Sequence, residues 1–270
     1  SVGADVTTTT GLFPNVSDRS GLFTQSTSNN LTGGNITVIS QAGSIDVSNL
    51  AEVNADNTGS GISGDIVLQA GGAISVTNLA QVNTRSTGLG ISGDILLQAG
   101  GAISVTDRAE VNTDNTGLTG LGISGNIVLQ AGGAIDVLRN AIIQSETFSG
   151  TSGFVDLVAS TVRVLNSLVS ASSFTGVAGS VFVNAGRSIE LGGVLADGRR
   201  AGLLAQSAAG TAGGVIIDTP QLTVRDGAQA AADGFSAAGG LFINAGSVNL
   251  QNNALLSAEN EIANSVVASG

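Results

Sequence analysis

The chain has 270 residues, of which 42% are apolar and 11% are charged, so it is too apolar for a disordered tail. It contains no Cys, His or Lys, which removes most of the metal ligands, activated nucleophiles and general bases that enzymes use. Its formal net charge of −11 disfavours nucleic acid and anionic membrane surfaces as partners. No apolar run approaches the roughly 18 residues of a membrane-spanning helix, so no membrane span is predicted.

A glycine that precedes a short alternating run recurs along the chain and divides it into units. Its positions are Gly34, Gly64, Gly93, Gly125, Gly153, Gly179, Gly213 and Gly239, which lie 26 to 34 residues apart. Residues 1–33 resemble a partial first coil, because Arg19–Ser26 reads like Arg200–Ser207, and residues 34–270 form eight repeats. We expect one β-solenoid domain over residues 1–270 that is a segment of a longer chain or a filament subunit.

Each unit contains three short alternating runs that are typical of strands. In the second unit the runs cover residues 65–70, 73–77 and 79–84, with corners predicted at Gly71–Gly72 and at Thr77–Asn78. Such a unit cannot bury its apolar side alone, whereas stacked copies bury it against one another. The predicted fold is therefore all-β: a parallel β-helix with three strands per coil and about eight to nine coils. A β-propeller fits less well, because its blades need four strands.

Stacking in register predicts three columns of side chains inside the coils. Two are aliphatic: Ile36, Ile66, Ile95, Ile127, Val155, Val181, Val215 and Leu241; and Ile45, Ile74, Ile103, Ile135, Val162, Ile189, Leu222 and Val248. The third is small, as a tight corner requires: Ala51, Ala80, Ala109, Ala141, Ser167, Ala228 and Ala254.

The outward side of the first strand is also apolar in six of eight units. A strand that is apolar on both sides is usually covered on both sides. Either loops or a terminal segment of the same chain cover it, or it packs against another subunit. The candidates for such an interface are Val67, Leu96, Val128, Phe182, Ile216 and Phe242.

One row of polar corner residues has ligand chemistry. Asp65, Asp94 and Asn126 are either Ca²⁺ ligands or solvated turn residues that accept hydrogen bonds from backbone N–H groups. Calcium is therefore the single cofactor candidate, and no other metal or cofactor site is predicted.

The third strand carries two further outward rows. Glu52 and Glu110 lie two coils apart, as a glycosidase pair could, but the face is expected to be flat and catalysis there is disfavoured. Asn54, Asn83 and Asn112 are expected to hydrogen-bond to one another along the solenoid. No catalytic residue is predicted, and Arg199–Arg200 is expected in a surface loop.

Two motifs resemble a known family. Residues 222–229, "LTVRDGAQ", and residues 236–246, "SAAGGLFINAG", are similar to repeats of filamentous-haemagglutinin-like exoproteins, above all to the large versions common in cyanobacteria. The resemblance implies a right-handed parallel β-helix, secretion by a two-partner outer-membrane route, and a role in adhesion or matrix at the cell surface. The secretion-recognition domain with which those proteins begin is not found in this sequence.

Together these features predict a non-enzymatic extracellular structural protein, a β-solenoid shaft of a filament or adhesin that associates with itself end to end or laterally. Two other classes stay open. A module that binds carbohydrate or a cell surface is disfavoured by the 3% aromatic content, because sugars stack on rings. A polysaccharide lyase or hydrolase is disfavoured by the missing Lys, His and Tyr.

Overall fold

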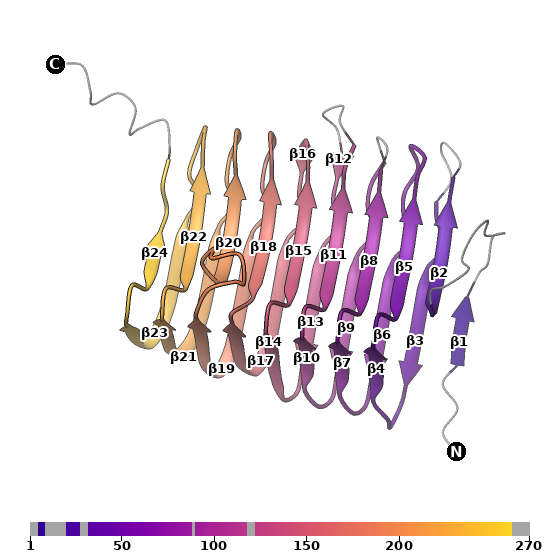
Figure 1. The fold of residues 1–270 in the computed structure, drawn as a ribbon, viewed down its shortest axis with the longest axis horizontal. Helices are drawn as coiled ribbons and strands as arrows, with labels where there is room; N and C mark the ends of the chain where they lie inside the picture. The colour runs from indigo at the N-terminus through magenta and orange to yellow at the C-terminus, as the bar shows by residue number, and fades with distance from the viewer. Residues whose placement is uncertain (1–4, 9–19, 28–31, 88–89, 118–121, 261–270) are drawn as a thin grey trace.

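The structure is a computed structural model that describes residues 5–8, 20–27, 32–87, 90–117 and 122–260. These residues form a parallel β-solenoid of about 8 turns, which confirms the predicted fold. Each turn runs down one side, reverses, and returns along the other side with a step at mid-height (Figure 1). We call the three stretches of a turn its first, second and third strands, and the surfaces that they build by stacking the first, second and third faces.

The third face is a nine-stranded parallel sheet that runs the length of the solenoid. Its strands are β2 (Gly21–Ser26), β5 (Glu52–Asn57), β8 (Gln81–Ser86), β11 (Glu110–Asn115), β15 (Ile142–Thr147), β18 (Leu168–Ser173), β20 (Gly202–Ser207), β22 (Gln229–Gly234) and β24 (Leu255–Ser257). Each residue stacks on its counterpart one turn later. Because β2 pairs with β5, the chain is already inside a coil before Gly34, as the repeat predicts.

The first and second faces belong to one sheet. In the N-terminal turns the first strands are β3 (Ile36–Ser40), β6 (Ile66–Ala70), β9 (Ile95–Ala99) and β13 (Ile127–Ala131), and the second strands are β4 (Ile45–Ser48), β7 (Ile74–Thr77), β10 (Ile103–Thr106) and β14 (Ala134–Leu138). In the later turns one long strand covers both faces: β17 (Val155–Leu165), β19 (Val181–Gly192), β21 (Val215–Arg225) and β23 (Leu241–Leu250). The short strands β12 (Gly122–Ile123) and β16 (Gly150–Thr151) pair near the third corner, which is the loop that leads from a third strand to the next marker glycine.

The merging of strands corrects the expectation of three separate strands in every coil. The glycine pair at Gly71–Gly72 bends the chain in an early turn, whereas Ser160 and Thr161 occupy the corresponding corner of β17. The later turns continue through the corner even where it holds a glycine, as at Gly186 of β19 and Gly246 of β23, and the register between β17 and β19 shifts between Ala159 and Thr161.

The core contains the predicted columns together with others that were not predicted, such as Leu68, Leu97 and Leu129. Both aliphatic columns are in register, and their members are buried except near the ends, where Val248 is 47% exposed. The small column has one member more than predicted: Ala201, which lies between Ser167 and Ala228 and is fully buried like them. Each fully buried Ile or Leu contributes about 1.5–3 kcal/mol through the hydrophobic effect.

The marker glycines lie where the backbone of one turn touches the next. A Cβ atom on Gly64, Gly93 or Gly125 would lie 1.9, 2.1 or 2.0 Å from the carbonyl oxygen of the marker glycine one turn earlier. No side chain fits at that distance, so only glycine permits the approach. The spacing that defines the repeat in the sequence is therefore a steric requirement of the stack.

The second corner consists of two successive residues with left-handed backbone conformation. In the second unit they are Asn78 and Leu79, with φ of 55° and 63°, one residue later than predicted; Thr77 is the last residue of β7. Asn adopts this conformation readily, whereas a bulky residue in it is strained by about 1–3 kcal/mol. The stack holds the strained residue, since the Leu79 N–H donates to the carbonyl oxygen of Asp107 at 3.1 Å. This corner is the step that Figure 1 shows in each turn.

The two ends of the sheet differ. At the N-terminal end β1 (Asp5–Thr8) pairs antiparallel with β3, whereas the other named strands pair in parallel. Unpaired strand edges invite pairing with other chains, and β1 occupies this one. At the other end no described strand pairs with the outer edge of β23, and the side chain of Leu250 there is 49% exposed.

Candidate functional site

The three calcium candidates lie in one row, and each binds the backbone of the next turn. Asp65 Oδ1 accepts the N–H of Asp94 at 2.9 Å, Asp94 Oδ1 accepts that of Asn126 at 2.7 Å, and Asn126 Oδ1 accepts that of Phe154 at 3.0 Å. The side chains therefore tie consecutive turns together, which is the second of the two roles that the sequence left open. Calcium binding at this row stays a prediction. Both carboxylates already accept a hydrogen bond from the next turn, so neither requires a cation to account for its position.

We expect Asp94→Asn to change the free energy of unfolding by less than about 0.5 kcal/mol, because the amide oxygen replaces the carboxylate as acceptor, as it does at Asn126. Asp94→Ala leaves the Asn126 N–H without this acceptor and is expected to lower it by about 1 kcal/mol. Thermal unfolding of both variants in millimolar CaCl₂ and in EDTA checks this. A Ca²⁺-dependent rise in wild-type stability that Asp94→Asn abolishes would identify a cation site instead.

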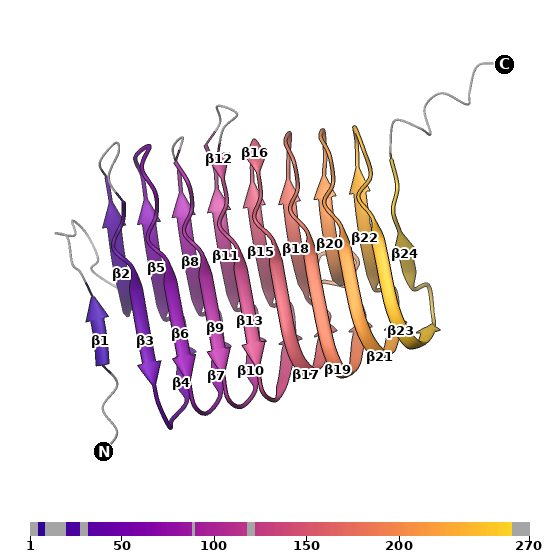
Figure 2. The same ribbon diagram turned by 180° about the vertical axis from the view of Figure 1, so that it is seen from behind.

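The six predicted interface residues form one outward row on the first face. Figure 2 shows the solenoid with this face towards the reader. Phe182 is 38% and Phe242 64% exposed, and the other four are half-buried. The apolar surface is wider than predicted, because the ring of Phe154 packs edge-on against that of Phe182 at 6.1 Å and is itself 37% exposed. We call the six residues the apolar stripe; the described part of the chain leaves it open to solvent.

Glu52 and Glu110 lie on the outer side of the third face with Gln81 stacked between them, two turns apart as predicted. A depression of about 330 Å³ opens farther along it, between β15 and β20.

The prediction that the stacked asparagines hydrogen-bond to one another is wrong. Asn54, Asn83 and Asn112 are stacked, but each donates its amide N–H to the side chain two residues earlier, at 2.7, 3.0 and 3.1 Å. For Asn54 and Asn112 that acceptor is a carboxylate, Glu52 or Glu110. A charged acceptor forms a stronger hydrogen bond than a neutral amide, so these contacts prevail over contacts between turns.

A column of charged residues that sequence reasoning did not single out runs beside these rows: Asp56, Arg85, Asp114 and Glu146 stack in register. Burial raises the pKa of Asp114 to about 7, with a further rise from the negative charge of Glu146. Asp114 Oδ1 is buried without a hydrogen-bond partner among the described residues. The sequence signal for this column is a charged residue at the same place in consecutive repeats.

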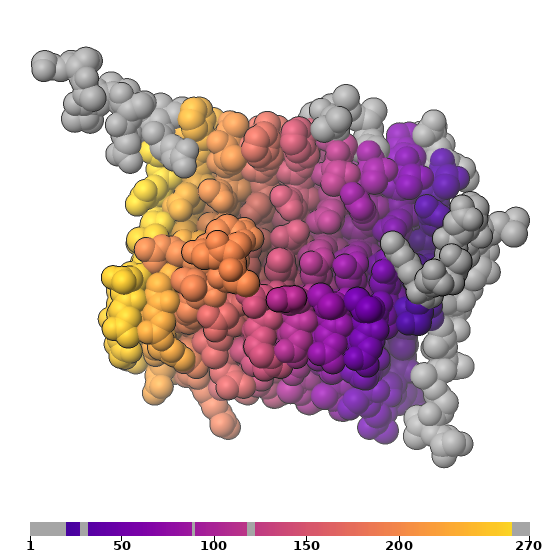
Figure 3. Space-filling model, viewed as in Figure 1, coloured from indigo at the N-terminus to yellow at the C-terminus, as the bar shows by residue number. Residues whose placement is uncertain are grey.

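The Arg199–Arg200 pair lies in a surface loop, as expected. This loop, residues 193–201, replaces the tight second corner between β19 and β20 and stands out in orange from the surface in Figure 3. Arg199 is paired with Asp197 at 2.7 Å, and Arg200 donates to the carbonyl oxygens of Gly227 and Asn253 at 2.8 and 2.7 Å.

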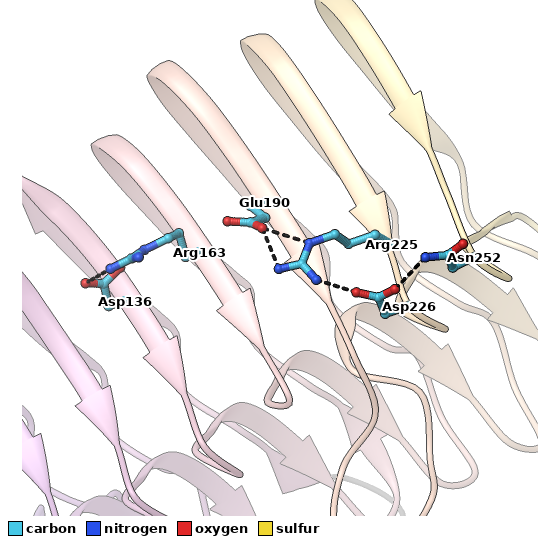
Figure 4. A network of polar contacts seen from close by, with 6 residues as sticks. All are labelled: Asp136, Arg163, Glu190, Arg225, Asp226 and Asn252. Atoms are coloured by element: carbon cyan, nitrogen blue, oxygen red, sulfur yellow. Dashed lines mark hydrogen bonds and ion pairs between the residues drawn. The ribbon is translucent and has the colours of Figure 1, made fainter.

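The second face carries a network of ion pairs and hydrogen bonds between turns, drawn in Figure 4: Asp136, Arg163, Glu190, Arg225, Asp226 and Asn252. The contact with Glu190, at 2.8 Å, and then that with Asp226 raise the pKa of Arg225. All of these side chains are partly exposed, so each pair contributes no more than about 0.2–1 kcal/mol. The network ties turns together, and its three carboxylates and two guanidinium groups leave it with one net negative charge.

The described residues contain no group of three or more acidic side chains arranged to hold a metal ion. Within the same part of the chain, no helix is long and apolar enough to cross a membrane. Comparisons with protein-family models, with curated proteins and with solved structures found no match for the chain.

Proposed function

We propose that the protein is a non-enzymatic extracellular structural protein, a β-solenoid shaft that forms or extends a cell-surface filament or adhesin. The observation that carries the proposal is the unbroken register of the third face, with the apolar stripe along the first face. Stacked identical turns make a stiff rod, and a long exposed apolar row favours contact between rods.

Other features support self-association as the rod's way of assembling. The open outer edge of β23 has the unpaired backbone groups that strand addition requires. The net charge of −11 favours solubility outside the contacts, and the resemblance of residues 222–229 and 236–246 to filamentous-haemagglutinin-like repeats favours an extracellular location.

Negative-stain electron microscopy of the purified chain, with and without Ca²⁺, tests the assembly. Long fibres of uniform width are expected for a filament subunit, and isolated short rods for a shaft segment of a larger adhesin. Compact particles of varied shape would contradict both forms of the proposal.

The non-enzymatic part of the proposal has a separate test. We expect no cleavage when the chain is incubated with acidic polysaccharides such as polygalacturonate and alginate. The release of reducing ends or of unsaturated products would contradict it and would make the protein a hydrolase or lyase.

Replacing Phe182 and Phe242 by serine is expected to weaken lateral association of the rods by about tenfold or more, because the two largest side chains of the apolar stripe are removed. Sedimentation velocity and fibre width measure the effect. Phe235→Ser is the matched control, since Phe235 is 42% exposed but lies outside the stripe. Unchanged association of the double variant would mean that the stripe is not an assembly surface.

A further inference from the structure

The loop at residues 193–201 is the one place in the described stack where the second corner becomes an excursion, and it is held rigidly. The N–H of Ala196 donates to Asn140 Oδ1 at 2.7 Å, and Asn166 Nδ2 donates to the carbonyl oxygen of Val194 at 2.9 Å. Arg200 reaches the backbone of the following turns through Gly227 and Asn253. Anchors on both sides make the loop a fixed wall, and pre-organised walls are what binding sites need.

This wall borders the depression on the third face. The floor consists of two outward rows that continue from turn to turn: Gln144, Ser170 and Leu204; and Glu146, Ser172 and Gln206. Arg199 lines the depression from the loop, and Phe174 lines it from the third corner. Its volume, about 330 Å³, lies within the range of small-molecule sites.

The lining combines a ring with many hydrogen-bonding groups. The ring of Phe174 is 54% exposed and stacks on that of Phe148 at 5.2 Å, which fixes its orientation. The chain has 8 Phe, and two of them meet at this rim. Amides, hydroxyls and a carboxylate that accepts a hydrogen bond from Gln144 Nε2 at 3.2 Å cover the floor. Arg199 contacts Asp197 through Nε, so this contact does not use its terminal nitrogens.

We infer that this depression binds a neutral, extended oligosaccharide. A sugar offers an apolar ring face to Phe174 and hydroxyls to the amides and hydroxyls of the floor. The row of Glu146, Ser172 and Gln206 places a polar side chain at every turn, about 4.8 Å apart, so a linear chain that lies along it meets a hydrogen-bonding group at each turn. An acidic sugar is disfavoured, because Glu146 repels it and the negative charge of Asp197 offsets the positive charge of Arg199.

Isothermal titration calorimetry of the full chain with cellohexaose tests the inference, with hexagalacturonate as the acidic probe of equal length. We expect cellohexaose to bind, hexagalacturonate to bind at least about tenfold more weakly, and Phe174→Ala or Gln206→Ala to weaken cellohexaose binding about tenfold. Phe235→Ala, which removes an exposed ring outside the depression, is the control and is expected to bind like the wild type.

Two results would overturn the inference. One is the absence of heat with cellohexaose for wild-type protein whose circular dichroism shows the folded β-structure. The other is cellohexaose binding that neither Phe174→Ala nor Gln206→Ala weakens, which would place the ligand elsewhere. Tighter binding of hexagalacturonate than of cellohexaose would refute the neutral ligand. These measurements do not depend on fibre formation, so the proposed structural role stands or falls separately.

Discussion

Replacing Gly125 by alanine is expected to lower the free energy of unfolding by about 3 kcal/mol or more, because one methyl group has no room between two turns. The new Cβ would lie 2.0 Å from the carbonyl oxygen of Gly93 and 2.9 Å from that of Ser92. Backbone atoms cannot rotate away as a side chain does, so the two turns must separate. The carbonyl oxygen of Gly125 also accepts hydrogen bonds from Thr113 and Ser145, at 2.7 and 3.0 Å, and would shift with its own residue.

Gly186→Ala is the matched control. Gly186 lies in β19 with no atom within 4 Å of the place where its Cβ would stand, and its backbone is not in the left-handed region. Urea unfolding monitored by circular dichroism should leave this variant close to the wild type and shift the midpoint of Gly125→Ala strongly downward. Equal midpoints for the two variants would mean that the turns are not packed at the marker glycines as described.

The second large effect is a stability that falls as the pH rises. Burial, then the negative charge of Glu146, and finally Glu110 and Asp56 raise the pKa of Asp114 from 3.8 to about 7, while Arg85 lowers it. A carboxyl with a raised folded-state pKa binds a proton more tightly in the folded than in the unfolded chain. Its stabilising effect is therefore complete below pH 4 and is lost as the pH rises towards 7, by at most about 4 kcal/mol.

Asp114→Asn removes this ionisation and keeps the shape of the side chain. We expect the variant to match the wild type within about 1 kcal/mol at pH 4 and to be more stable by about 2 kcal/mol or more at pH 8, where the wild-type carboxyl is charged. Asp218→Asn, an exposed carboxylate on the first face, is the control and should leave the pH dependence unchanged. A parallel pH dependence for Asp114→Asn and the wild type would show that Asp114 titrates normally.

The two predictions concern different parts of the same architecture. Gly125 keeps the turns close enough to pair. Asp114 places a buried charge on the third face, which a purely structural face does not need. The third face also holds the depression beside the loop at residues 193–201. Asp114 stacks against Glu146, which lines this depression.

The sequence by itself determined the parallel solenoid, its register and its interior. The reason is that a repeat places the same residue at the same point of every turn, so columns such as Ile36 to Leu241 follow from spacing alone. It also determined the outward direction of the apolar stripe, because side chains alternate along a strand. The marker glycine was visible as a spacing, although its reason, a carbonyl oxygen 2.0 Å from the missing Cβ of Gly125, was not.

Only the tertiary structure decided what the outward residues do. Asp65 and Asp94 have carboxylate oxygens of the kind that bind cations. Their role as acceptors of backbone hydrogen bonds depends on which N–H group the next turn presents. The pKa of Asp114 depends on the burial of its column, which a strand pattern does not report. In the sequence, residues 193–201 look like an ordinary surface loop. In the structure, the contacts of Arg200 fix this loop beside the floor of the depression. Repetition encodes the stack locally, whereas burial, charge and concavity arise between turns.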